Sequence, residues 1–270
     1  MEKKMNRIEA KFAQAKEAGQ KAFIPFITAG DPDLPTTGEI ILEFERRGAS
    51  IIELGIPYSD PIADGPVIQA SYTRALNRNI PVREILEFIA NLREKTQIPL
   101  ISMVSYSIVH KCGMEEYLGR AKEAGLDGLI VPDLPVDEAR ELSSAAETYS
   151  LKTILLCAPS TPPQRRRHIA EVSTGFIYYI SVMGITGPRE RLPEDVQEHL
   201  RELKSLTDKP VCIGFGVSRA EQVRMLARVA DGVIVGSAIV NLIAENAERP
   251  REEIVSITGE FIADLMTGLK

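Results

Sequence analysis

The chain has 270 residues, 44% hydrophobic and 26% charged, which is the composition of a globular protein with a large core. Its formal net charge of −6 argues against a binding surface for nucleic acid or for an anionic membrane. No apolar run is long enough to span a bilayer, and the N-terminus MEKKMNRIEAKF lacks the apolar core of a signal peptide. Three widely spaced cysteines form no CxxC pair, so we expect a cytoplasmic protein without a disulfide framework or a zinc site.

Short apolar runs alternate with amphipathic segments along the whole chain. The runs predict eight strands, at residues within 22–32, 50–55, 99–103, 127–131, 152–157, 176–180, 211–215 and 232–235. The amphipathic segments predict helices at about 3–18, 35–47, 66–77, 82–95, 114–124, 136–149, 163–172, 193–206 and 219–227, then a short helix from Ser237 and a longer one at 252–266.

This alternation decides the predicted fold class. Strands that are apolar on both faces are typical of a parallel sheet covered by helices. Eight such units in one chain, with no linker or composition shift, favour a single α/β domain, 1–270, folded as a (β/α)8 TIM barrel rather than an open doubly wound sheet. The first helix is extra to the barrel, and the short helix after the eighth strand is a candidate phosphate-binding helix. Chemistry in this fold lies on the loops that follow the strands.

The stretch 51–66, IIELGIPYSDPIADGP, holds the candidate acid–base groups. Glu53 lies in the middle of an apolar strand, where an unpaired charge is costly. Asp64 follows in the proline-rich loop, and two carboxylates in different surroundings can act as acid and base near neutral pH. Each has another interpretation: Glu53 could be ion-paired inside the barrel, and Asp64 could cap a turn.

Three glycine-rich loops follow the last three strands: SVMGITG, GFGVS and GSAIV. Glycine lets backbone N–H groups approach an anion, and a helix N-terminus adds a favourable dipole. One such loop alone would more simply be a tight turn, but three in these places predict a phosphate site. The candidate donors are the backbones of Gly187, Gly216, Gly236 and Ser237, with the Ser237 hydroxyl.

Other polar residues are interpreted structurally. Asp60 and Asp133 stand beside prolines and are assigned to loop architecture. His110, His168 and His199 lie in or beside predicted helices, away from the strand ends, and the arginine run 165–167 is predicted to be a solvated helix face. No metal-ligand spacing, P-loop or dinucleotide fingerprint occurs in the sequence.

Six motifs together resemble one family over essentially the whole chain, the alpha subunit of tryptophan synthase. They are PFITAGDP (25–32), ELGIPYSDPIADGPVIQ (53–69), VPDLP (131–135), GITG (184–187), GFGVS (214–218) and GSAIV (236–240). The resemblance implies a lyase of tryptophan biosynthesis that cleaves indole-3-glycerol phosphate to indole and glyceraldehyde 3-phosphate. It also implies a beta subunit that consumes the indole within an alpha-beta-beta-alpha heterotetramer and carries the pyridoxal phosphate, while the alpha reaction itself needs no cofactor and no metal.

The resemblance also implies roles for individual residues. Glu53 and Asp64 fall on the catalytic pair of the family, and Thr186 falls in a mobile loop that closes over the substrate and meets Asp64. Tyr178 is implied near the substrate and Phe26 in the indole pocket. The four phosphate-site residues named above correspond to those that hold the phosphate in the family.

The chain departs from the family pattern at two places. Ser105 and Ser107 stand where many members carry Tyr-x-Asn, a region of contact to the beta subunit, and Val182 stands where many carry arginine. No role is transferred to these positions.

The chemistry implied by the resemblance agrees with the residue types. Glu53, flanked by apolar residues, is predicted to have a pKa raised by desolvation, as a general acid needs. Asp64, in a more polar loop, is predicted to stay ionised and to accept the indole N–H. Two alternatives remain at this point, another phosphate-handling barrel such as a sugar-phosphate isomerase, and a non-enzymatic scaffold that only activates its partner.

Overall fold

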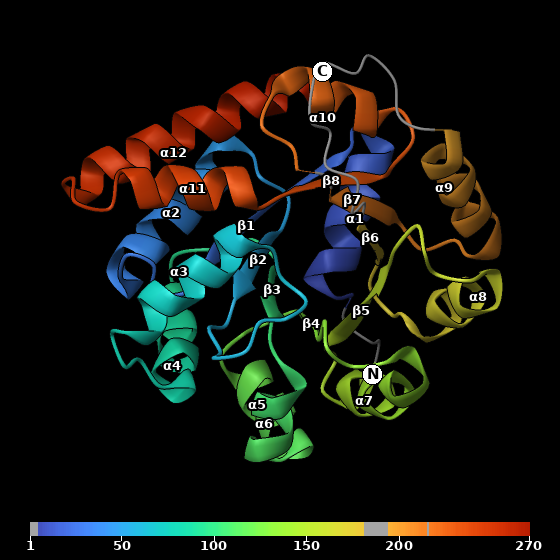
Figure 1. The fold of residues 1–270 in the computed structure, drawn as a ribbon, viewed down its shortest axis with the longest axis horizontal. Helices are drawn as coiled ribbons and strands as arrows, with labels where there is room; N and C mark the ends of the chain where they lie inside the picture. The colour runs from blue at the N-terminus through green and yellow to red at the C-terminus, as the bar shows by residue number, and fades with distance from the viewer. Residues whose placement is uncertain (1–4, 181–193, 215) are drawn as a thin grey trace.

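A computed structural model describes residues 5–180, 194–214 and 216–270, and in it eight parallel strands form a closed barrel ringed by helices (Figure 1). The strands are β1 (Ala22–Thr28), β2 (Ile52–Gly55), β3 (Leu100–Met103), β4 (Gly128–Ile130), β5 (Lys152–Cys157), β6 (Ile177–Ile180), β7 (Val211–Gly214) and β8 (Gly232–Val235). Each strand pairs in parallel with the next one, and β8 pairs with β1. The predicted TIM barrel is therefore confirmed.

The first helix precedes the first strand, and the other helices of the described residues lie between or after the strands. The helices are α1 (Arg7–Glu17), α2 (Leu34–Arg47), α3 (Pro66–Leu76), α4 (Val82–Leu92), α5 (Tyr106–Cys112), α6 (Met114–Glu123), α7 (Val136–Thr148), α8 (Pro163–Val172), α9 (Glu194–Leu206), α10 (Ala220–Ala227), α11 (Ser237–Glu245) and α12 (Arg251–Met266), and the short 3-10 helix η1 (Thr267–Leu269) follows.

Three details differ from the sequence prediction. The first helix was expected from about residue 3, but α1 begins at Arg7 because Asn6 caps it: the Asn6 side chain accepts from the Ile8 N–H, and Glu9 accepts from the Asn6 N–H. Helix α5 was not predicted at all. The arginine run is not uniformly solvated, since Arg166 is buried and bonds Glu202 at 2.8 Å.

Two apolar cores hold the barrel. One lies between the strands and the helices and includes Phe23, Phe44 and Tyr179. The other fills the barrel interior and includes Ile24 and Ile101. Its strand residues alternate along each strand with those that face the helices. Every residue of β1 is buried, as expected for a strand covered on both faces.

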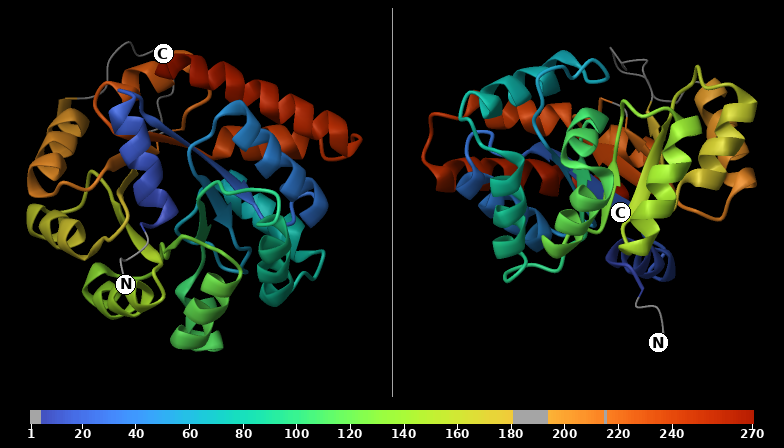
Figure 2. Two further views of the ribbon diagram at one scale, coloured as in Figure 1. Left: turned by 180° about the vertical axis from the view of Figure 1, so that it is seen from behind. Right: turned by 90° about the horizontal axis from the view of Figure 1, so that it is seen from below.

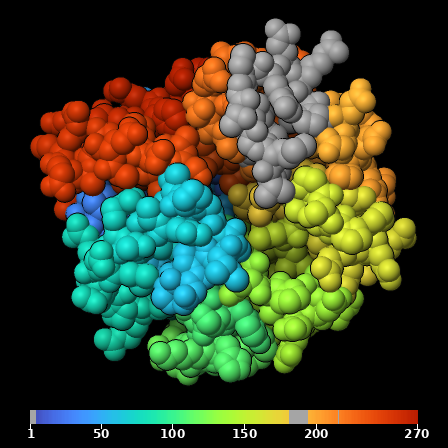
Figure 3. Space-filling model, viewed as in Figure 1, coloured from blue at the N-terminus to red at the C-terminus, as the bar shows by residue number. Residues whose placement is uncertain are grey.

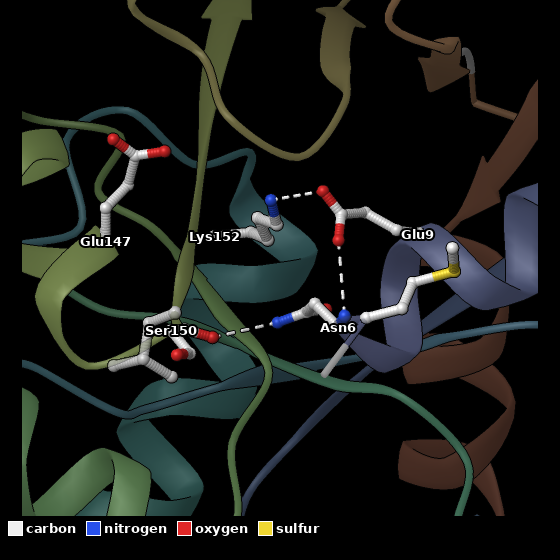
Figure 4. Close-up of a pocket in the computed structure, with 7 residues that line it drawn as sticks. Asn6, Glu9, Glu147, Ser150 and Lys152 are labelled. Atoms are coloured by element: carbon white, nitrogen blue, oxygen red, sulfur yellow. Dashed lines mark hydrogen bonds and ion pairs between the residues drawn. The ribbon is translucent and has the colours of Figure 1, made fainter. Parts of the chain in front are cut away.

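Helix α1 closes the end of the barrel at which the strands begin (Figure 2). The ring of Phe12 on this helix packs against Phe176, with centroids 5.6 Å apart, at the bottom of the interior core. Around it, the Asn6 side chain donates to the Ser150 carbonyl at 3.0 Å and Glu9 pairs with Lys152 (Figure 4). The α1 helix is thus a plug that is fixed by both apolar and polar contacts.

The pocket drawn in Figure 4, about 290 Å³ in volume, belongs to this closed end. It lies beside the beginning of β5, whereas the loops that carry the candidate acid–base groups follow the strand ends on the opposite side (Figure 2). It is therefore not the site that the sequence predicts. In the described part of the chain, no helix is both long and apolar enough to cross a membrane.

Candidate active site

Glu53 lies inside the barrel, at the middle of β2. Its backbone is in register with Phe26 of β1 and Ile101 of β3, which point into the same interior core. The residue is 1% exposed, and neither carboxyl oxygen has a hydrogen-bond partner among the described residues. Desolvation, with a further contribution from the charge of Asp64, raises the pKa of Glu53 to about 8. Ion pairing, the alternative interpretation of this glutamate, is not observed in the described residues, and the predicted rise of the pKa is confirmed.

Asp64 lies in the loop between β2 and α3, close enough to Glu53 for the two charges to interact. The Tyr58 hydroxyl donates to its Oδ2 at 3.3 Å. Burial raises the pKa of Asp64 to about 6, the Tyr58 hydrogen bond lowers it, and the nearby charge of Asp133 raises it. At pH 7 the carboxyl is mostly ionised, as predicted, but its surroundings are less polar than the sequence suggested. The result is an acid and a base whose pKa values bracket neutrality.

Two aromatic side chains border this pair. Phe26 lies against Gly55, where an added Cβ would come within 2.6 Å of the ring. Tyr178 on β6 fills the space beside Gly214 in the same way, with its hydroxyl 2.7 Å from the position of such a Cβ. Burial, then the charges of Glu53 and Asp64, raise the pKa of Tyr178, so its hydroxyl remains neutral and lies within electrostatic reach of both carboxyls. The structure thus brings four of the predicted site residues to one mouth of the barrel.

The candidate phosphate side lies on the last strands. Helix α11 begins at Ser237 directly after β8, with Gly236 as its N-cap and, among the described residues, no side-chain cap; the Ile239 N–H bonds the Gly236 carbonyl at 2.9 Å, which leaves the N–H groups of Ser237 and Ala238 for an anion. Gly236 lies beside Phe26, its hypothetical Cβ being 3.4 Å from the phenylalanine Cβ. Gly216 adopts φ +49° with open space beside it. Thr186 and Gly187 lie outside the described residues.

The face at which the strands end is seen in space-filling form in Figure 3. The loop that contains Tyr58 and Asp64 (cyan) and the yellow segments around β5 and β6 border a hollow near its middle. Glu53, buried on β2, lies below this loop in the barrel interior. The hollow thus lies on the face of the barrel where β2 and the loop with Asp64 end.

The remaining polar candidates have structural partners. Asp133 accepts from the Ser105 hydroxyl at 2.7 Å and from the Tyr106 N–H at 2.8 Å, which fixes the start of α5. Its assignment to loop architecture is confirmed, although its charge also acts on Asp64. His168 and His199 lie in α8 and α9 as expected, and His110 lies in α5, the helix that the sequence did not predict. Among the described residues, no group of three or more His, Cys, Asp or Glu side chains is arranged to hold a metal ion.

Comparison with known proteins identifies the family. The family model for the tryptophan synthase alpha chain matches residues 12–264. The chain belongs to the tryptophan synthase alpha chain family. Members of this family are lyases of tryptophan biosynthesis, and this chain is one of them.

Relatives and solved structures of this family cover nearly the whole chain. The tryptophan synthase alpha chain of Caldanaerobacter subterraneus subsp. tengcongensis is 46% identical over 261 residues, which are 97% of this chain and 98% of that protein. That of Gloeobacter violaceus is 47% identical over 91% of this chain and 89% of its own. The crystal structure of tryptophan synthase subunit alpha from Legionella pneumophila superposes with a TM-score of 0.89 at 32% identity, covering 98% of each chain.

Sequence reasoning missed two tyrosines at this site. Tyr58 bonds Asp64, and the buried hydroxyl of Tyr72 lies 2.8 Å from the position of a Cβ on Gly55, so that it faces the end of β2. Tyr58 stands inside the motif quoted above, but a tyrosine between a proline and a serine carries no chemical signal of its own. Tyr72 lies on α3 and would pass for an ordinary core residue of a helix.

Proposed function

We propose that this chain catalyses the retro-aldol cleavage of indole-3-glycerol phosphate to indole and glyceraldehyde 3-phosphate. The observation that carries the proposal is the pairing of Glu53, buried with both oxygens unpaired among the described residues, with Asp64 on the following loop. A carboxyl with a pKa of about 8 is protonated at pH 7 and can donate, while one with a pKa of about 6 is ionised and can accept.

These two groups suffice for the chemistry. The Glu53 carboxyl donates its proton to C3 of the indole ring, and the Asp64 carboxylate accepts the ring N–H and so stabilises the positive charge that develops there. The bond between indole C3 and the glycerol carbon then breaks, and its electron pair neutralises the ring. The hydroxyl on that carbon returns a proton to Glu53 and becomes the aldehyde of the product. Both catalytic side chains end in their starting protonation states.

The phosphate group is assigned to the amides of Gly216, Gly236 and Ser237, with the Ser237 hydroxyl and with Gly187. The N–H groups of Ser237 and Ala238 at the start of α11, together with the helix dipole, support this assignment, since both favour an anion. Phe26 and Tyr178 would border the indole ring, and Thr186 is assigned to substrate binding, as the family resemblance implies. No cofactor or metal is assigned to the reaction.

The proposed partner is a beta subunit that carries pyridoxal phosphate, in an alpha-beta-beta-alpha heterotetramer. A tryptophan synthase complex from Pyrococcus furiosus includes a chain that is 37% identical to this one, with a TM-score of 0.83. The loop after β2 borders the hollow in Figure 3, which is the proposed entrance of the substrate, and it carries Ile62, which is 88% exposed. A partner that receives indole would dock on this loop. We also propose a cytoplasmic location, which the three free cysteines support.

The test is an assay of indole release from indole-3-glycerol phosphate by the purified chain, with and without the beta subunit. We expect indole and glyceraldehyde 3-phosphate in equal amounts. Release of neither product under both conditions would overturn the proposed reaction. Turnover of sugar phosphates instead would favour the isomerase alternative, and full activation of the beta subunit without any cleavage would favour the scaffold alternative.

A further inference from the structure

Tyr58 lies on the same loop as Asp64, between β2 and α3, and its ring is part of the interior core. It is 8% exposed, and its ring packs against that of Tyr72 on α3 with centroids 5.4 Å apart and planes tilted by 52°. Its hydroxyl therefore cannot swing freely into solvent, and it is aimed at Oδ2 of Asp64, 3.3 Å away. The loop residue that accepts the indole N–H in the proposed function is thus tied to the aromatic packing of the barrel interior.

The ionised form of Asp64 needs such a donor because its surroundings oppose the charge. Burial disfavours the carboxylate, and Asp133, on the loop after β4, adds a negative charge nearby. Glu53 on β2, Tyr178 on β6 and Tyr72 on α3 also lie within electrostatic reach of Asp64, and none of these groups carries a positive charge in any ionisation state. Against these influences, the Tyr58 hydrogen bond favours the carboxylate.

We propose that Tyr58 is a positioning residue for this reaction: its hydroxyl orients the Asp64 carboxylate and keeps it negatively charged, so that the free oxygen can accept the indole N–H. The inference rests on the proposed function for its catalytic consequence, but the tie between Tyr58 and Asp64 can be measured without any substrate. The same bond leaves only one carboxylate oxygen of Asp64 free of Tyr58, which selects the direction from which the N–H approaches.

The first measurement is a titration of Asp64 in the free protein by carbon-13 NMR, with labelled aspartate and with Asp64→Asn to assign the signal. Tyr58→Phe keeps the ring packed against Tyr72 and removes only the hydroxyl. We expect the pKa of Asp64 to rise in this variant by roughly 0.5 to 1 unit, since a hydrogen bond to a charged group stabilises that charge. An unchanged Asp64 titration would overturn the inference.

The matched control is Tyr117→Phe. Tyr117 is another buried tyrosine with a long hydrogen bond, 3.4 Å to Ser102, but it lies on α6 in the outer core, and Ser102 is not one of the site residues. We expect this variant to leave the Asp64 pKa and the rate of indole release unchanged. A shift of equal size in Tyr117→Phe would mean that any loss of a buried hydroxyl disturbs Asp64, which would also overturn the inference.

The second measurement is the pH dependence of indole release. In Tyr58→Phe we expect the acidic limb of kcat/KM to move to higher pH by the same amount as the Asp64 pKa, so that the rate loss is larger at pH 6 than at pH 8. A purely structural role would lower the rate equally at both. If the parent chain releases no indole, the proposed function fails while the NMR result still decides the link to Asp64. If the parent is active and neither measurement moves, the inference alone fails.

Discussion

The Glu53 carboxyl is the most unusual single group in the structure, because it is fully buried without a partner among the described residues. If it is the proton donor to indole C3, Glu53→Gln should lower kcat by at least ~100-fold, the usual contribution of a general acid–base group. KM should change little, because the amide has the same shape. Steady-state kinetics of indole release test this, and parental turnover in the variant would remove Glu53 from the mechanism. Asp64→Asn should be nearly inactive in the same assay, because the amide carries no negative charge to stabilise the positive charge that develops on the indole ring.

The same burial predicts a pH-dependent cost in stability. The folded chain holds the Glu53 proton up to about pH 8, whereas the unfolded chain releases it near the ordinary value of 4.5. The folded state therefore binds more protons in this window, and the contribution of Glu53 to the free energy of unfolding falls as the pH rises. Glu53→Gln should gain stability relative to the parent between pH 5 and pH 8. Urea unfolding of both proteins at several pH values measures the difference in their free energies of unfolding. A difference that does not change with pH would contradict the raised pKa of Glu53.

The pKa values of Glu53 and Asp64 together predict a bell-shaped dependence of kcat/KM on pH. Activity requires Asp64 ionised and Glu53 protonated, so kcat/KM should fall below pH 6 and again above pH 8, the approximate pKa values of the two groups. Because the two charges interact, the limbs report the pair rather than either residue alone. A pH–rate profile of the free enzyme is the measurement. A plateau that extends without loss from pH 5 to pH 9 would exclude this acid–base assignment.

At the scale of elements, Asp127 at the start of β4 connects several segments near the closed end of the barrel. Its carboxylate accepts from Arg7 on α1 at 2.9 Å, from Arg93 after α4 at 2.8 Å and from the Leu100 N–H at 3.0 Å. The Arg93 side chain is only 10% exposed, and it also donates to two backbone carbonyls. The Asp127 carboxylate thus balances a buried positive charge.

Asp127→Ala should therefore destabilise the fold by about 3–5 kcal/mol, because it leaves the buried Arg93 charge unpaired. Thermal or urea unfolding measures the loss. Arg83→Ala is a suitable control, since the Arg83–Glu87 pair is exposed on α4 and should contribute less than about 1 kcal/mol. Equal effects of the two substitutions would show that burial is not what makes Asp127 important.

The elements also show how far the sequence alone could go. Strands 152–157 and 232–235 and helix 163–172 were predicted to the residue, because apolar runs and flanking turn residues mark their ends. Helix α5 was missed because it has only seven residues and its start is fixed by Asp133, which is far away in the sequence. Tyr58 and Tyr72 were missed for another reason: both are close to Asp64 in the sequence, but only the packed structure shows that the Tyr58 hydroxyl faces the carboxylate and that the Tyr72 ring packs against Tyr58.

For the whole molecule, the testable consequence is assembly. We expect the chain to co-purify with a beta subunit that carries pyridoxal phosphate, and the complex to elute ahead of either chain in size-exclusion chromatography. Ile62→Asp changes an exposed residue of the loop after β2. It should weaken the complex while leaving the unfolding transition of the isolated chain unchanged. Undiminished association of this variant would place the contact elsewhere on the surface.

The two ends of the barrel have different roles, one in stability and the other in the proposed catalysis. Helix α1, with Phe12 against Phe176, seals one mouth, and the proposed proton donor and acceptor occupy the other. Substitutions that raise the thermal stability of the closed end should not change turnover. Substitutions that change the pocket at the open end should leave the contacts of α1 intact. A chain of this kind can therefore change its substrate during evolution without losing stability.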